Sequence, residues 1–100
     1  MSKERIAGAL GLVCRAGRIT TGVYLVKEEI RKGKAAVVLL ASDAAENAEK
    51  KIASLAEHRG VPVKRISLTK AEFGQCLGKQ AETVCASVPH EFLNLVLASL

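Results

Sequence analysis

The spacing of hydrophobic residues changes along the chain and predicts helices alternating with strands. Near the start, Ile6, Leu10 and Val13 recur at helical spacing, so we expect a helix from Ser2, its N-cap, to about Cys14. Further on, residues 35–41 form an apolar run without polar interruption. Such a run is typical of a strand that is buried on both faces of a sheet.

Three other segments have the composition of strands. Arg18–Thr21 is short and partly β-branched, and predicts a short strand or an extended entry into the next helix. Val61–Ile66 follows Gly60, which together with Pro62 ends the preceding helix, and Thr83–Val88 is rich in β-forming residues. Together with residues 35–41 they give four predicted strands.

Capping residues mark the remaining helices. A helix over residues 23–32 should end at Gly33, and Asp43 with Glu46 forms an N-cap signal for a helix that runs to about Arg59. The capping-box pattern Thr69-x-x-Glu72 opens a short helix. Pro89 suits the first position of a last helix over residues 89–100.

This alternation predicts the α/β class: a three-layer α/β/α sandwich with a mostly parallel four-stranded central sheet. One hundred residues suit a single domain, 1–100, and a hydrophobic content of 49% excludes intrinsic disorder. No apolar run approaches the roughly 20 residues of a membrane span, and the first residues carry no secretory signal. We therefore expect a cytoplasmic protein with no membrane partner.

The positive charge is concentrated at one end of the sequence. Residues 1–34 hold eight Lys and Arg against three acids, whereas residues 35–100 hold seven of each, so the whole excess of +5 is N-terminal. A one-sided basic field favours a polyanionic partner, although a solvated basic helix face would give the same pattern.

Signals of enzymatic chemistry are weak. The chain has no phosphate-binding loop, no GxGxxG and no HExxH. Its three cysteines form no CxxC pair and its two histidines stand alone, so we expect buried or semi-buried thiols and no metal site. The expectation is no enzyme, no catalytic residue, no cofactor and no small-molecule substrate.

The glycine-rich stretch between the first two helices is the candidate binding site. Gly17 and Gly22 allow a ligand close to the backbone, and the helix that opens at Thr21–Gly22 offers free N–H groups to phosphate. We expect Arg15 and Arg18 to flank this helix start, and Lys27, Arg31 and Lys32 to continue the basic surface along the helix. The chain contains only Tyr24, Phe73 and Phe92 as aromatic residues, too few for a base-stacking platform on a sheet.

Several motifs resemble the ribosomal protein L7Ae/L30e family, and most closely its small bacterial branch. The resemblance covers essentially the whole chain and rests on the order and spacing of these segments: Leu10–Gly17, Gly22, Ile30–Ala35, Val37–Ala44, Asn47–Ile52, Val61–Val63, Phe73–Gly74, Leu77–Gly78 and Val84–Val88. It implies an α/β/α sandwich that binds kink-turn RNA, a sharply bent duplex with tandem sheared G·A pairs.

The resemblance also implies which residues bind the RNA. In the family, the helix that opens at the position of Gly22 inserts its N-terminus at the G·A pairs, and the loop before the last strand packs against a flipped-out nucleotide. This chain has Tyr24, Leu25 and Glu28 where the archaeal pattern has Asn, Glu and Lys. The positions that the family implicates and the basic and glycine residues of the candidate stretch together give the expected RNA-binding residues: Arg15, Gly17, Arg18, Thr21, Gly22, Val23, Tyr24, Leu25, Lys27, Glu28, Arg31, Asp43, Lys79, Gln80, Ala81 and Glu82.

Two functions from different classes follow. The first is a ribosomal-protein-like binder of structured, kink-turn-type RNA, with ribosomal RNA or another kink-turn-containing RNA as its partner. The second is a protein–protein interaction module on the same fold with weakened RNA recognition, which the absence of Asn and Glu at positions 24 and 25 motivates.

Overall fold

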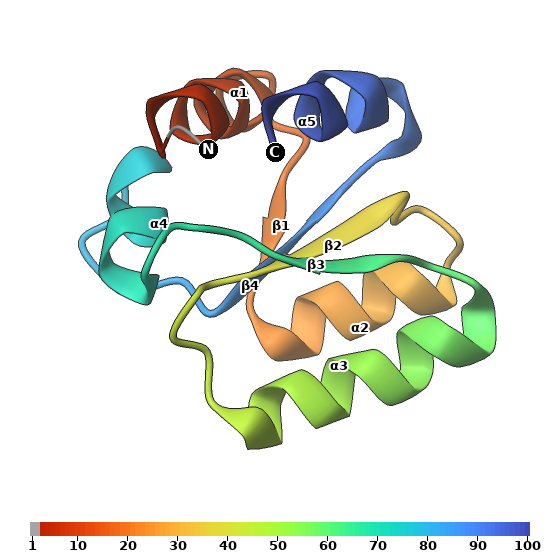
Figure 1. Cartoon of the computed structure of the whole chain (residues 1–100). Coiled ribbons are helices and arrows are strands. Elements are labelled where there is room, and N and C mark those ends of the chain that lie inside the picture. Colours follow the sequence, from red (N-terminus) through yellow and green to blue (C-terminus); the bar gives the residue numbers. More distant parts are fainter. Residues whose placement is uncertain (1–2) are drawn as a thin grey trace.

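A computed structural model describes residues 3–100 and shows helices on both faces of one sheet (Figure 1). In Figure 1, α1 and α5 lie on one face, α2 and α3 lie on the other, and α4 lies beside one end of the sheet. The elements in chain order are α1 (Lys3–Arg15), β1 (Thr20–Thr21), α2 (Val23–Arg31), β2 (Val37–Leu40), α3 (Glu46–Arg59), β3 (Val63–Arg65), α4 (Lys70–Cys76), β4 (Cys85–Val88), the 3-10 turn η1 (His90–Phe92) and α5 (Leu93–Ser99).

The sheet is mixed, so the prediction of a mostly parallel sheet is wrong. The strand order is β1-β4-β2-β3, and only β2 and β3 pair in parallel. Strand β4 is antiparallel to both of its neighbours. The physical reason is the position of α4, which stays at one end of the sheet and does not cross its face, so that the chain re-enters in the opposite direction (Figure 1).

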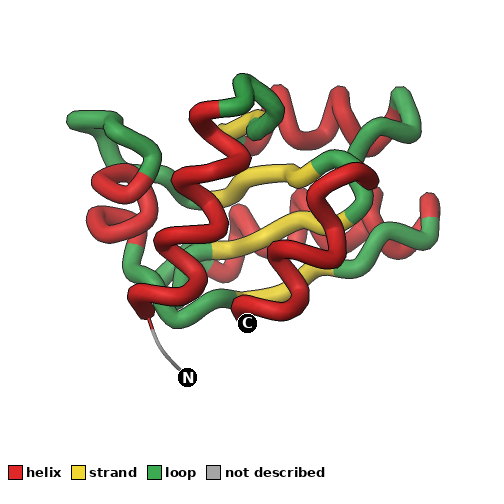
Figure 2. The backbone as a smooth tube through the Cα atoms, turned by 90° about the horizontal axis from the view of Figure 1, so that it is seen from above, coloured by secondary structure: helices red, strands yellow, loops and turns green. Residues whose placement is uncertain are grey.

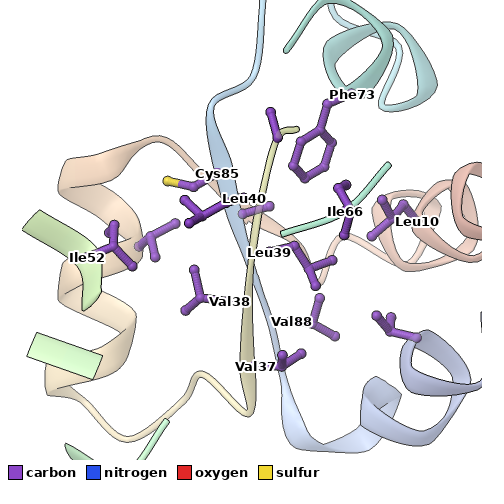
Figure 3. Close-up of a cluster of buried hydrophobic side chains, with 14 of the residues drawn as sticks. Leu10, Val37, Val38, Leu39, Leu40, Ile52, Ile66, Phe73, Cys85 and Val88 are labelled. Carbon is purple, nitrogen blue, oxygen red and sulfur yellow. The ribbon is translucent and has the colours of Figure 1, made fainter. Parts of the chain in front are cut away.

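Strand β2 supplies the centre of the core, as its unbroken apolar run predicts. All four of its residues are buried. In Figure 3, Val38 and Leu40 point toward the side of Ile52, whereas Leu39 points toward Ile66 and Leu10 on the other face. Figure 2 shows α1 and α5 crossing above the strands and covering that second face. Burial on both sides explains why the segment contains no polar residue.

The capping box of α4 is confirmed. The Thr69 hydroxyl accepts a hydrogen bond from the Glu72 N–H, and the Glu72 carboxylate accepts one from the Thr69 N–H. Lys3 of α1 also lies 3.0 Å from the Glu72 carboxylate. The carboxylate is therefore stabilised by a backbone hydrogen bond first and by the Lys3 side chain second, which lowers the pKa of Glu72 below its ordinary value.

Three predicted helix starts have different outcomes. Helix α3 begins at Glu46 after Ala45, without a side-chain cap, so Asp43 is not its N-cap. The Asp43 Oδ1 instead accepts a hydrogen bond of 2.8 Å from the backbone N–H of Lys70, the first residue of α4. Pro89 precedes the short turn η1, and the last α-helix begins only at Leu93. The predicted N-cap Ser2 lies outside the described residues.

Within residues 3–100, no helix combines the length and the apolar character that a membrane crossing requires.

Candidate nucleic-acid interface

Helix α2 begins with backbone donors that no side chain caps. Its N-cap, Gly22, has φ 92° and ψ 146°, a conformation that favours glycine, and no side chain caps the helix. The Gly22 N–H donates to the Cys85 carbonyl at 3.1 Å, which fixes the helix start against β4. The helical bonding pattern starts only with the Val26 N–H, which donates to the Gly22 carbonyl. The N–H groups of residues 23–25 therefore have no acceptor within the helix and can bind an anion or a base edge.

The side chains of the first turn divide between the core and the solvent. Val23 is partly buried and packs against the core. Tyr24 is 72% exposed and Leu25 is 54% exposed, although both are large and hydrophobic. An aromatic ring and an aliphatic side chain therefore border the free N–H groups, where a nucleotide base could pack against them.

The structure brings the second predicted contact, the loop Lys79–Glu82, to the same place. The Lys79 Nζ donates a hydrogen bond to the Thr21 Oγ1 at 2.8 Å, just before the start of α2. The loop ends near Cys85, whose carbonyl accepts the Gly22 N–H. Gln80, Ala81 and Glu82 are exposed. One continuous surface thus contains the helix start and the loop.

Helix α4 holds both ends of this loop by backbone hydrogen bonds. The Lys79 N–H donates to the Gly74 carbonyl at 2.9 Å, and the Thr83 N–H donates to the Lys70 carbonyl at 3.0 Å. Gly74 is buried, and a Cβ atom at this position would clash with the backbone carbonyl of Ala81. Reasoning from the sequence did not assign Gly74 a role in the site; the signal was a glycine in the middle of a well-capped helix.

Asp43 is linked to the same loop through the first residue of α4. Its carboxylate accepts the Lys70 N–H, and the Lys70 carbonyl accepts the Thr83 N–H. The side chain of Lys70 also lies 4.0 Å from the Glu82 carboxylate. Asp43 is thereby connected to the loop through Lys70.

Arg15 and Arg18 do not flank the start of α2, contrary to the sequence prediction. Arg18 lies at the opposite end of β1, where it forms an ion pair of 2.7 Å with Glu91, beyond the C-terminal end of β4. Gly17 lines a surface pocket together with Arg18 and Glu91. Arg15 lies on α1 beside α5, on the face of the sheet away from α2 (Figure 1). The N-terminal excess of charge is therefore divided between two faces of the molecule.

The remaining predicted residues lie along α2. Arg31 forms an ion pair of 3.1 Å with Glu28, which reduces the charge that both residues offer to a ligand. Lys27 and Arg31 line a groove between α2 and α3. These residues continue the surface away from the helix start.

The thiols of Cys76 and Cys85 are unsuited to nucleophilic chemistry at neutral pH. Burial raises the pKa of Cys85 to about 11, and burial with the nearby Cys14 raises the pKa of Cys76 to about 11. Both groups are therefore protonated thiols at neutral pH. Across the described residues 3–100, no group of three or more His, Cys, Asp or Glu side chains could hold a metal ion.

Comparisons with known proteins agree on the family to which the chain is similar. The sequence model of the ribosomal protein L7Ae/L30e/S12e/Gadd45 family matches residues 4–95. The RNA-binding protein YlxQ of Bacillus subtilis (strain 168) is 36% identical over 91% of this chain and 90% of its own length. The RNA-binding protein YlxQ of Enterococcus faecium is 35% identical over 78% of this chain and 75% of its own length.

Solved structures share the fold. A protein of unknown function from Bacillus halodurans superposes with a TM-score of 0.87 at 28% identity, over 95% of both chains. The Giardia lamblia 15.5kD RNA binding protein superposes with a TM-score of 0.79 at 22% identity, over 99% of this chain and 87% of its own. At 22% identity the likeness is one of fold.

Proposed function

Because the chain belongs to the ribosomal protein L7Ae/L30e/S12e/Gadd45 family, we propose that it binds structured RNA of the kink-turn type. The binding surface consists of the start of α2 and the loop Lys79–Glu82. One observation carries this assignment: the hydrogen bond of 2.8 Å from Lys79 to Thr21, which joins the two predicted contacts into one surface. The curated relatives from Bacillus subtilis and Enterococcus faecium, both described as RNA-binding proteins, support it.

The backbone makes the central contact in this proposal. The N–H groups of residues 23–25 face acceptor atoms of the RNA, and the helix dipole adds a partial positive charge at the same point. Gly22 lets the RNA approach because it has no side chain there. Such a contact reads the shape of a bent RNA more than its linear sequence.

Tyr24 and the loop hold the nucleotide that leaves the helical stack. The exposed ring of Tyr24 offers a stacking face, and Leu25 provides an apolar contact beside it. Asn and Glu occupy these positions in the archaeal pattern, so we infer that stacking here replaces part of their hydrogen bonding. The proposal therefore includes recognition of ribosomal RNA or another kink-turn-containing RNA in the cytoplasm, without catalysis.

Equilibrium binding tests the proposed function. The protein is titrated with a kink-turn RNA and with a plain duplex of the same length, at several salt concentrations. We expect tighter binding of the kink-turn RNA and, for roughly four phosphate contacts, a log–log salt slope near −3 to −4. Equal affinity for both RNAs would contradict recognition of the bend.

A second candidate function, contact with another protein, is favoured by an exposed apolar groove. Leu12 of α1 is 48% exposed and Leu95 of α5 is 38% exposed, and both line a groove of about 510 Å³ with Gly8 and Ala98. If replacing Thr21, Tyr24 and Lys79 together by alanine leaves RNA affinity unchanged, the RNA proposal fails and this groove becomes the favoured interface.

A further inference from the structure

The groove between α2 and α3 gathers basic side chains from two separate segments of the chain. It has a volume of about 570 Å³ and is lined by Lys27 and Arg31 of α2 and by Lys51 and His58 of α3. Figure 1 shows the two helices side by side and running in the same direction. The Arg59 Nη1 donates to the Arg31 carbonyl at 3.0 Å and joins their C-terminal ends.

The groove has cationic groups that are not neutralised within the protein. Among the described residues, the ammonium groups of Lys27 and Lys51 form no hydrogen bond or ion pair, whereas Arg31 pairs with Glu28. The acidic lining residue of this groove is Glu57, which is exposed. Unpaired ammonium groups in a concave surface favour a polyanion, because the walls limit the screening of their field by water.

The groove also continues the surface of the proposed function. Lys27 lies one helical turn after Val23, and Arg31 lies one turn further, about 6 Å along the same axis. Lys51 and His58 lie along α3 in the same direction. A strand that leaves the start of α2 can therefore follow the groove with its phosphates near Lys27, Arg31 and Lys51, and the His58 ring can offer an N–H donor.

We propose that this groove binds the sugar–phosphate backbone of a single RNA strand that extends from the structured element held at the start of α2. The inference rests on the proposed function and adds Lys51 and His58 of α3 to the contact surface. It requires no base-specific contact, because the lining offers charge and one aliphatic side chain, Leu55, but no aromatic ring. The added strand contributes affinity that depends on salt and not on sequence.

Two RNAs and matched variants test this proposal. One RNA is a blunt kink-turn duplex, and the other carries a single-stranded polyuridine extension on the strand nearest α2. The test variant is the double substitution Lys51→Ala with His58→Ala. The control is Lys50→Ala, because Lys50 is the neighbouring residue on α3 but is exposed outside the groove and pairs with Glu46 at 3.1 Å.

For the original protein, we expect the extension to increase affinity about tenfold and to steepen the log–log salt slope by about one or two. The double variant should lose this gain while keeping its affinity for the blunt RNA, and Lys50→Ala should keep both. An extension that gives no gain, or equal losses in the control, would overturn the groove proposal. Displacement of the extension by polyglutamate at equal charge would overturn it in favour of an acidic protein partner. Failure to bind the blunt RNA would instead refute the proposed function.

Discussion

The Nζ atom of Lys79 lies 2.8 Å from the Oγ1 atom of Thr21, although the two residues are 58 positions apart. Thr21 ends β1 just before the uncapped start of α2, and Lys79 begins the loop that α4 supports. The bond places two segments side by side that the family resemblance implicates separately. It also holds an ammonium group next to free backbone N–H groups, so that the surface can receive a phosphate.

Replacing Lys79 by alanine should weaken RNA binding without unfolding the protein. The hydrogen bond lies on the surface, where such contacts contribute about 0–1 kcal/mol to stability, so the melting temperature should hardly change. The salt slope should decrease by about one, as expected for the loss of one phosphate contact. Lys64→Ala is the control, because Lys64 is exposed on β3 at the other edge of the sheet. Equal effects of both variants would argue against a local contact.

Gly74→Ala should displace the loop Lys79–Glu82. The added methyl group meets the Ala81 carbonyl in a buried position, and overpacking of this kind costs about 1–3 kcal/mol of the free energy of unfolding. RNA affinity should fall because the loop moves away from Thr21. Gly8→Ala is the matched control, because a Cβ at this exposed helical position would meet no atom within 4 Å. This variant should raise the free energy of unfolding by about 0.5–1 kcal/mol. Chemical unfolding and RNA titration measure both effects.

Tyr24 should contribute through its ring. Tyr24→Ala should weaken RNA binding by about 1–3 kcal/mol, the range for one stacked base, whereas Tyr24→Phe should retain most of the affinity. Neither variant should change stability much, because the side chain is 72% exposed. If Tyr24→Phe binds as weakly as Tyr24→Ala, the hydroxyl group and not the ring makes the contact.

The ionised carboxylate of Glu72 should stabilise the fold, and this contribution should be lost in acid. Its pKa is lowered in the folded state, mainly by the backbone hydrogen bond from Thr69, so the ionised form favours folding. This contribution is complete above the ordinary value of 4.5 and is lost as the pH falls through the lower folded value. Glu72→Gln should lower the melting temperature at neutral pH and reduce its dependence on pH below 4.5. Parallel pH profiles for the two proteins would contradict this linkage.

Local chemistry made most of the elements predictable from the sequence. The unbroken apolar run 35–41 contains the buried strand β2, and the Thr69–Glu72 capping box opens α4 as expected. Strand direction was not predictable in the same way. A helix between two strands usually returns the chain in parallel, but α4 has only seven residues and lies at one end of the sheet, which reverses β4.

The candidate site was predictable only in part. The start of α2 and the loop Lys79–Glu82 are recognisable from the family pattern, and the structure places them together. Arg15 and Arg18 are close to Gly22 in sequence but not in space. Arg15 belongs to α1, which lies on the face of the sheet away from α2. Arg18 is separated from Gly22 by the length of β1 and pairs with Glu91 at its other end. The long-range contacts of Gly74 and Asp43 depend on the fold; the sequence signals only that Gly74 is a glycine in the middle of a capped helix, and not what it contacts.

The most direct test is an amide chemical-shift titration of the isotopically labelled protein with a kink-turn RNA. The N–H groups proposed to contact RNA are themselves the nuclei observed. We predict that the largest shifts occur at residues 23–25 and 79–82, with small shifts on α1 and α5. Largest shifts at Leu12, Arg15 and Leu95, with residues 23–25 unchanged, would contradict the account.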